Sequence, residues 1–326
     1  ARPIATRISP TVRLGADGFD RNAGRNAVTI AALGMALGNV VNVAAFVGSM
    51  ESSIVSWFER SIRSDIFVFS GREVKAKFEH PMPEALDDAF GAIEGVEFVN
   101  AFRMIRSTFR DEPFYLLSHE LEQYARYNEI PVAEGNLQDA IAEIETGRGI
   151  AASTTFAHFY GVKVGDEISL NTPDGPRVFR ISMVYVDYSA DIGILSTTRE
   201  VYRDVWRDTL VDSYGIYVRK GADAAAIRDE ILGVHGSKYG LMALLNADYR
   251  REVIALLDRS FALTHAMELV AIVVAVLGIV NTLLVTVIDR KMEIGILKAI
   301  GATASQVRPV FVTEAALIGF ASSVVG

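Results

Sequence analysis

Leu269–Ile288 reads LVAIVVAVLGIVNTLLVTVI, and this stretch decides the class of the protein. It holds 20 residues without a charge, and only Gly278, Asn281, Thr282 and Thr286 are not plainly apolar. A helix of about 20 such residues crosses the hydrocarbon core of a bilayer. The stretch therefore predicts a membrane-spanning helix, because it is unusually long for a buried helix of a globular protein.

Two further apolar runs lie near the ends of the chain. Residues 26–50 carry no charge over 25 positions, and the run that begins near Pro309 continues to residue 326. A signal anchor followed by a soluble domain would explain the first run only. We therefore predict spans over 26–50 and 262–288, and the start of a third, truncated span over 308–326.

The sequence lacks the residue patterns of most catalytic and cofactor sites. The 326 residues include no cysteine, which excludes disulfides, thiolate metal sites and cysteine nucleophiles. The five histidines have no ligand spacing, and no glycine-rich phosphate loop occurs. Asp187, Tyr188 and Asp191 could hold a cation, although an acidic loop at a strand end is the commoner arrangement. We predict no metal, no cofactor and no enzymatic activity in this chain.

Charge is distributed unevenly along the chain. Residues 1–25 have a net charge of +3, and residues 289–326 have a net charge of +1. Residues 51–261 carry 23 basic and 34 acidic side chains, a net charge of −11. Short basic flanks of membrane spans stay in the cytoplasm. We expect segments 1–25 and 289–307 inside the cell and the acidic segment 51–261 outside it. An acidic domain repels nucleic acid, so we predict no nucleic-acid partner.

The long segment between the first two spans has the pattern of a mixed α/β domain. A hairpin is predicted where the alternating stretches 166–171 and 177–186 flank Thr-Pro-Asp-Gly-Pro, a strong turn signal. Alternating and β-rich stretches predict strands over 65–70, 96–109, 113–118, 192–196 and 212–219. Helices are predicted over 84–93, 137–145, 153–160, 198–208 and 223–232, the last ending at Gly233.

A single helix is predicted from Asp248 through Ile288, without Pro or Gly before Gly278. These 41 residues would extend about 60 Å at 1.5 Å per residue, whereas a span needs only about 30 Å. The helix should therefore leave the bilayer as a stalk. Its apolar stripe should pack on the amphipathic segment 52–64 or on a second copy, through Val253, Leu256, Leu257 and Phe261.

Small and amide residues in the predicted spans favour helix packing. Small residues four apart let helix backbones approach closely in lipid, and an amide in hydrocarbon needs a partner. Glycine and alanine are also simply common in membrane helices, and both interpretations stay open. The packing candidates are Gly34, Gly38 and Asn42 in the first span, and Ala271, Ala275 and Asn281 in the second.

The loop after the second span reads DRKMEIGILKAIGAT from Asp289 to Thr303. Met292, Ile296, Ala299 and Ile300 share one face of a helix, and Gly301 is placed to end it. The pattern indicates a short amphipathic helix on the cytoplasmic side. From its physics alone, a helix that lies on the lipid surface fits equally well.

This stretch, continued by Gln306-Val307, Phe311 and Glu314, resembles the loop of FtsX-like (MacB-like, type VII) ABC transporter permeases. The resemblance extends, more loosely, to residues 21–29 before the first span and to residues 149–170 with the hairpin that follows. It implies transmembrane helices with a large extracytoplasmic α+β domain, in which a small β-rich subdomain is inserted into a porter-like α/β part. The family has four spans, whereas here the third is cut and no ATPase is fused. The basic opening 13–25 resembles the start of the second half of two-unit permeases.

The resemblance implies a permease subunit, or half of one, of the inner membrane. It would couple ATP hydrolysis by a cytoplasmic ATPase to movements of the outer domain, in export, lipoprotein release or a related envelope process. Expected partners are that ATPase, a second permease unit, the bilayer and a periplasmic adaptor, lipoprotein or hydrolase. The alternative is a two-span anchor for an extracytoplasmic binding or sensor module. The residues implied in ATPase coupling are Arg290, Met292, Glu293, Gly295, Ile296, Leu297, Lys298, Ile300 and Gly301.

Overall fold

A computed structural model describes residues 23–71, 80–289, 291–299, 301 and 303–325. The chain divides into two compact units. The first comprises Ala1–Glu51 and Asp258–Gly326, and the second comprises Ser52–Leu257.

The first unit is helical. Its helices are the greater part of α3 (Ala23–Ser61) and of α11 (Asn246–Asp289), followed by α12 (Lys291–Ala299) and α13 (Ala304–Val325). Helix α11 is continuous over 44 residues, which confirms the single helix predicted from Asp248 to Ile288. Within this unit His265 Nε2 of α11 lies 4.0 Å from Glu51 Oε2 of α3.

Two helices in the described part of the chain are long and apolar enough to cross a bilayer. By length and composition they are Ala27–Ser61 and Asn246–Gly278. The third predicted span corresponds to α13, whose apolar stretch Ala315–Val324 is shorter. Two of the three expected spans thus overlap candidate helices of sufficient length.

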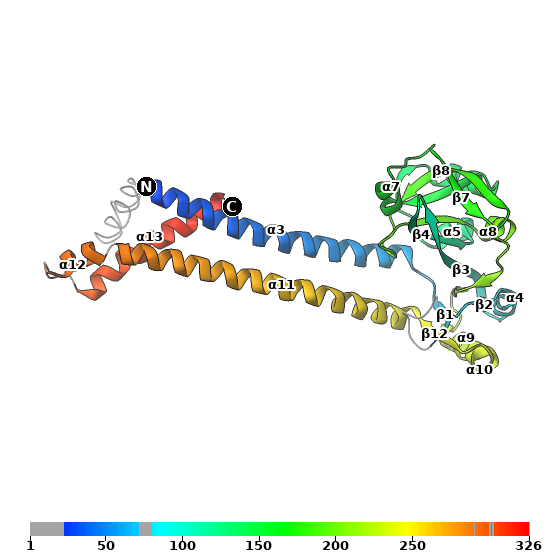
Figure 1. Cartoon of the computed structure of the whole chain (residues 1–326). Helices are drawn as coiled ribbons and strands as arrows, with labels where there is room; N and C mark the ends of the chain where they lie inside the picture. The colour runs from blue at the N-terminus through cyan, green and yellow to red at the C-terminus, as the bar shows by residue number, and fades with distance from the viewer. Residues whose placement is uncertain (1–22, 72–79, 290, 300, 302, 326) are drawn as a thin grey trace. The chain divides into compact units, whose positions relative to one another are not determined.

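The second unit is an α/β domain built on one mixed sheet (Figure 1). Ten strands of the described residues form it, in the order β12-β1-β11-β3-β4-β9-β6-β8-β5, with β7 paired to β8. A separate two-stranded ladder joins β2 (Met82–Pro83) to β10 (Leu210–Val211). The strands of the large sheet are β1 (Ile66–Ser70), β3 (Val96–Phe109), β4 (Glu112–His119), β5 (Val132–Gly135), β6 (Gly149–Ser153), β7 (Glu167–Thr172), β8 (Gly175–Tyr185), β9 (Ile194–Thr198), β11 (Ser213–Val218) and β12 (Leu241–Leu245).

Side-chain caps define the start of most helices in this domain. Asn136, Ser153, Thr198 and Asp223 each accept backbone N–H bonds at the first turn, as N-cap residues do. The helices are α4 (Ala85–Gly91), α5 (Leu121–Tyr127), α6 (Leu137–Glu145), α7 (Thr154–Tyr160), α8 (Arg199–Trp206), α9 (Ala224–Ile231) and α10 (Ser237–Tyr239), with the π-helical turn η2 (Leu232–Gly236) between the last two.

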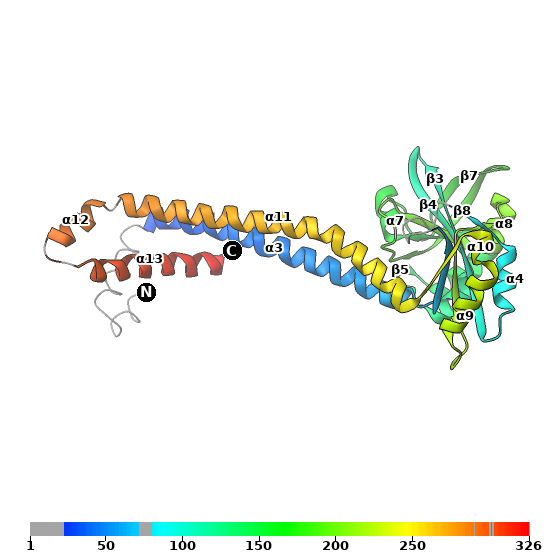
Figure 2. The same cartoon turned by 90° about the horizontal axis from the view of Figure 1, so that it is seen from below.

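Strand β3 is shared by two lobes of the domain. Its first half, Val96–Phe102, pairs with β11, and its second half, Arg103–Phe109, pairs with β4. The first lobe contains β1, β11 and β12 with α4, α9 and α10, which lie close together in Figures 1 and 2. The second lobe is the segment inserted between β3 and β11.

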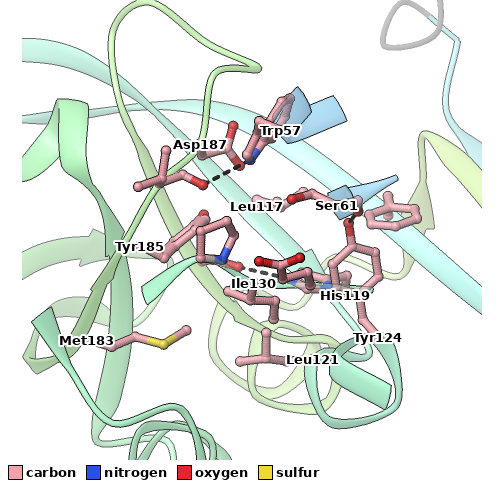
Figure 3. A pocket seen from close by; sticks show the side chains of 15 residues that line it. Trp57, Ser61, Leu117, His119, Leu121, Tyr124, Ile130, Met183, Tyr185 and Asp187 are labelled. Atoms are coloured by element: carbon pink, nitrogen blue, oxygen red, sulfur yellow. Dashed lines mark hydrogen bonds between the residues drawn. The ribbon is translucent and has the colours of Figure 1, made fainter. Parts of the chain in front are cut away.

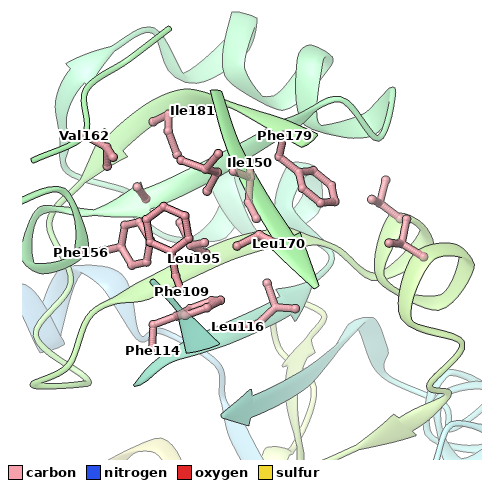
Figure 4. Close-up of a cluster of buried hydrophobic side chains, with 14 of the residues drawn as sticks. Phe109, Phe114, Leu116, Ile150, Phe156, Val162, Leu170, Phe179, Ile181 and Leu195 are labelled. Atoms are coloured by element: carbon pink, nitrogen blue, oxygen red, sulfur yellow. The ribbon is translucent and has the colours of Figure 1, made fainter. Parts of the chain in front are cut away.

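Each lobe has its own apolar core. The first lobe buries Ile66, Phe90, Tyr214 and Ile216 at 0% exposure. In the second lobe, Phe156 belongs to a cluster with buried residues of β3, β4, β6, β7, β8 and β9 (Figure 4). A fully buried large side chain stabilises a fold by about 1.5–3 kcal/mol. Each lobe therefore has a separate source of stability.

The structure confirms some sequence predictions and corrects others. Strands β7 and β8 form the predicted hairpin, with Thr172 opposite Gly175. The prediction that Gly233 ends a helix is wrong: the chain continues through η2 and α10 and turns at Gly240, with φ of +62°. Gly240 adopts the left-handed conformation that glycine tolerates best, so the helical stretch that begins with α9 ends at Gly240 and not at Gly233. The sequence predictions missed α5, α10, β2, β5, β6, β10 and β12.

Candidate functional site

The predicted coupling segment forms helix α12, Lys291–Ala299. Met292 and Ile296 lie four residues apart on it, with 79% and 59% of their surfaces exposed. Gly295 is exposed, and Glu293, Leu297 and Lys298 belong to the same helix. Gly301 follows the helix with φ of +99°, a conformation typical of a helix end. Arg290 and Ile300 lie outside the described residues.

The predicted packing residues occupy the two long helices. Gly34 is buried, Gly38 is half-buried and Asn42 is exposed on α3. Ala271 and Asn281 are exposed on α11, which also contains Ala275. The role of these six residues between membrane helices remains a prediction.

The best-defined site is a junction within the second unit, where the last turns of α3 and the first turns of α11 meet its sheet. Trp57, near the end of α3, donates its indole Nε1–H to the carbonyl oxygen of Val186 at 3.0 Å. Its ring also meets Tyr188 edge-on, with 5.8 Å between ring centroids. Because Val186 directly follows β8, this contact fixes the end of α3 to the second lobe.

Residues of α5 and its C-cap form hydrogen bonds with the end of α3. The hydroxyl of Tyr124 donates to the carbonyl oxygen of Ser61. The side-chain oxygen of Asn128 accepts from the backbone N–H of Arg63 at 2.9 Å, and its amide donates to the hydroxyl of Tyr217 at 2.6 Å. The bond from Tyr124 satisfies a carbonyl group that the end of α3 leaves without an intrahelical partner.

Helix α11 begins at the same place. The amide group of Asn246 donates to the carbonyl oxygen of Ser64 at 2.8 Å. The ring of Tyr249 stacks on Phe67 at 4.0 Å between centroids and on Phe58 at 6.0 Å. Stacked aromatic pairs add about 0.5–1.5 kcal/mol beyond the area they bury. The two helices and strand β1 thus share one aromatic cluster.

One part of the predicted stalk stripe joins this cluster. Val253 packs against it, whereas Leu256 is 37% exposed. An ion pair between Arg250 and Glu59 further links α11 to α3. Packing of the stripe on segment 52–64 is therefore confirmed at Val253.

Burial controls the ionisable groups of the junction. Burial lowers the pKa of His119 to about 3, so its imidazole is neutral at physiological pH. Burial also raises the pKa values of Tyr124 and Tyr185 well above the usual value, which keeps both hydroxyls protonated. Asp187 accepts bonds from the backbone N–H of Ser189 at 2.7 Å and from its hydroxyl at 2.5 Å. The imidazole of His119 and the phenols of Tyr124 and Tyr185 are therefore uncharged hydrogen-bonding groups.

Sequence comparison places both units among known permeases. The model of the FtsX-like permease C-terminal family matches residues 266–326, and that of the MacB-like periplasmic core domain matches residues 27–234. An uncharacterized ABC transporter permease protein of Mycobacterium tuberculosis is 27% identical over 96% of the chain. The ABC transporter permease YtrF of Bacillus subtilis is 44% identical over 18% of the chain and 13% of its own length.

The chain spans 37% of the length of the mycobacterial relative. Among solved structures, the periplasmic region of MacB from Actinobacillus actinomycetemcomitans aligns with a TM-score of 0.45 at 11% identity, over 58% of this chain and 91% of that one. The MacB-like core-domain match covers more than half of the chain, and the FtsX-like match follows it in order. The chain therefore belongs to the FtsX-like, MacB-like family of ABC transporter permeases.

Proposed function

We propose that this chain transmits motion from a cytoplasmic ATPase to its extracytoplasmic domain. The observation that carries the proposal is the junction, where Trp57 and Tyr124 bond α3 to the second lobe, and Asn246 of α11 bonds to Ser64 between α3 and β1. A displacement of either helix would act on the sheet, because α11 follows β12 directly and only residues 62–65 separate α3 from β1.

The ATPase would dock on α12. Met292 and Ile296 give this helix an exposed apolar face, and apolar faces of amphipathic helices bind grooves of partner proteins. The remaining proposed coupling residues are Arg290, Glu293, Gly295, Leu297, Lys298, Ile300 and Gly301. Hydrolysis itself would take place in the partner, so this chain would not be an enzyme.

Ile296→Asp should abolish binding of the ATPase. The new carboxylate would be desolvated in the docked complex without a partner, which costs several kcal/mol. Co-purification with the ATPase measures the loss, and recovery of the variant in the membrane fraction shows that it is inserted. Val178→Asp is the matched control, since Val178 is 56% exposed on β8 and lies outside the docking helix. Unchanged affinity of Ile296→Asp for the ATPase would contradict the docking face.

We propose that the chain lies in the cell membrane with several spans and that residues 51–261 lie on the outer side. A cysteine introduced at Asn171 should then react with an impermeant thiol reagent added to intact cells, and one at Ser305 should not. The natural chain has no cysteine, so all labelling comes from the introduced one. The short basic flanks predict this orientation. Labelling at Ser305 without labelling at Asn171 would reverse it.

A second permease unit would complete the assembly. Asn42 and Asn281 are exposed in this chain although they lie in apolar helices. An amide in hydrocarbon needs a hydrogen-bonding partner, which a neighbouring unit would supply. A periplasmic adaptor, a lipoprotein or a hydrolase would be the partner of the outer domain.

A further inference from the structure

Apart from the shared strand β3, the two lobes meet where the start of α4 in the first lobe faces the start of α8 in the second. Arg199, the first residue of α8, has a side chain with 0% exposure. Its Nη2 donates to Glu84 Oε1 at 2.8 Å, and Nη1 of Arg203 donates to the same oxygen at 3.2 Å. Glu84 directly precedes α4. Two guanidinium groups of the second lobe thus bind one carboxylate of the first, and we call this region the α4–α8 contact.

The buried guanidinium of Arg199 depends on this ion pair. Its other described bonds are to neutral groups, the hydroxyl of Ser118 at 3.2 Å and the carbonyl oxygen of Leu210 at 3.3 Å. Its Nε has no partner among the described residues. A buried charge that loses its ionic partner is strongly destabilising. Glu84 is therefore essential for the α4–α8 contact.

The α4–α8 contact contains more acidic than basic side chains. Asp87 and Asp88 lie in the first turn of α4, Glu120 precedes α5, and Glu200 lies in the first turn of α8. Together with Glu84 they make five carboxylates among the described residues, against the two guanidinium groups. Asp87 belongs to the first lobe and Glu120 to the second. Like charges therefore repel each other across the contact.

Asp87 is half-buried in this surplus of negative charge. Burial raises the pKa of Asp87 to about 6, and the carboxylates of Glu120, Glu84 and Asp88 add to the rise. The guanidinium of Arg199 acts in the opposite direction. Asp87 therefore takes up a proton between about pH 7 and pH 5, a range in which an ordinary aspartate stays ionised.

Two further titratable groups face Asp87 in the described part of the chain. Burial also raises the pKa of Glu120, on which the charges of Arg203, Arg199, Glu84 and Glu200 act. The hydroxyl of Tyr214 donates to the carbonyl oxygen of Pro83 at 3.0 Å. Burial and the charge of Asp87 raise the pKa of Tyr214, so this hydroxyl stays protonated. Glu120 thus responds to pH in the same direction as Asp87, and Tyr214 does not respond.

A second contact between the lobes, at α5, consists of uncharged groups. The rings of His119 and Tyr124, which lie close together in Figure 3, both meet Phe102 in the first half of β3. The amide of Asn128 donates to the hydroxyl of Tyr217. Burial lowers the pKa of His119 to about 3 and raises that of Tyr217. None of these groups changes its charge between about pH 5 and pH 7.5, so the α5 contact serves as an internal reference.

We propose that the α4–α8 contact is a pH-sensitive switch, which binds the two lobes more tightly when Asp87 is protonated. The proton removes one negative charge from the surplus and leaves the ion pair of Arg199 with Glu84 in place. When the contact opens, Asp87 becomes hydrated and loses affinity for the proton. Opening therefore becomes less favourable as the pH falls, and the added stability is lost as the pH rises through about 6.

The switch would act on the outer side of the membrane. There the surroundings of the cell set the pH, and acidification would make the two lobes move as one body. This setting rests on the proposed function, whereas the switch itself depends only on the contacts within the domain.

The test measures amide hydrogen exchange in the full chain in lipid nanodiscs without ATPase, corrected for the intrinsic effect of pH on exchange. Between pH 7.5 and pH 5 the protection of α4 should rise about tenfold with a midpoint near pH 6, since one proton is lost when the pKa falls from about 6 to 3.8 on opening. The protection of α5 should stay unchanged.

Two substitutions assign the response to Asp87. Asp87→Asn keeps the shape and removes the charge, so α4 should be as protected at pH 7.5 as it is in the parent at pH 5. Glu120→Gln removes a repelling charge and should move the midpoint to lower pH. Asp139→Asn is the matched control, because Asp139 is exposed in the first turn of α6 and is not among the charges that act on Asp87. It should leave the midpoint unchanged.

Several outcomes would overturn the proposal. They are equal protection of α4 at both pH values, a pH response that Asp87→Asn retains, and an equal response in α5, which would make the effect global. If Asp87→Asn loses protection in α5 as well, it has not folded, and the midpoint of Glu120→Gln then decides. None of these results bears on ATPase docking, which the Ile296→Asp experiment tests separately.

Discussion

Leu257→Pro should leave ATP hydrolysis intact and abolish the response of the outer domain. Leu257 lies inside α11, a helix of 44 residues. Proline there removes the backbone bond to Val253 and clashes with that carbonyl group, at a cost of about 3 kcal/mol or more. The helix should kink between α12 and the junction, because the residues on either side keep their own packing.

The measurement is hydrogen–deuterium exchange of the β1 and β12 amides, with and without ATP, in the complex with its ATPase. The parent should show nucleotide-dependent exchange, and Leu257→Pro should show none at an unchanged rate of hydrolysis. Leu257→Ala is the control for the lost side chain, since alanine keeps the helix. If exchange in Leu257→Pro still follows the nucleotide, α11 is not the transmitting element and the two-span anchor becomes the better interpretation.

Trp57→Ala should also uncouple the outer domain, with a large loss of stability. Truncating a buried tryptophan costs about 3–5 kcal/mol, and here the bond to Val186 is lost as well. The end of α3 would then be held to the second lobe mainly by α5. Nucleotide-dependent exchange in β8 and β9 should disappear.

Trp206→Ala provides a matched comparison. Trp206 is buried to the same degree, at 9% exposure against 8% for Trp57, but it stacks on Phe179 and Tyr202 in the core of the second lobe. Both variants should lower the melting temperature by similar amounts. Only Trp57→Ala should lose the nucleotide-dependent exchange. If both variants lose it equally, the assay reports the loss of stability and not the loss of the junction.

Elements with a local signal could be predicted from the sequence. Thr-Pro-Asp-Gly-Pro between two alternating stretches predicted the β7–β8 hairpin, and the long uninterrupted pattern after Asp248 predicted α11. Both depend on residues close together in the chain. Strand β6 was not among the predicted strands, because its five residues are all buried and show no alternation.

The junction depends on contacts that no local pattern contains. Trp57 bonds to a residue 129 positions away, and Asn246 bonds to Ser64 across 182 positions. Tyr124 lies in α5 and Asn128 is its C-cap, and this helix of seven residues is too short for a clear period. Trp57 did carry one signal, since it is one of two tryptophans and lies on the amphipathic segment 52–64.

The shared strand β3 also has a consequence for how the polypeptide reaches its native state. Pairing of β1 with β11 joins Ile66 to Ile216, a separation of 150 positions, and closing so long a loop is entropically slow. Once the inserted lobe has formed, the loop that must close between β1 and β11 is effectively shorter. Arg103 Nη1 and Asp212 Oδ1, at the base of that lobe, lie 2.7 Å apart. We expect the second lobe to become structured first during synthesis and the first lobe last. Pulse-labelled hydrogen exchange would resolve this order. The first lobe would then be assembled only when the chain has been made through β11 and β12.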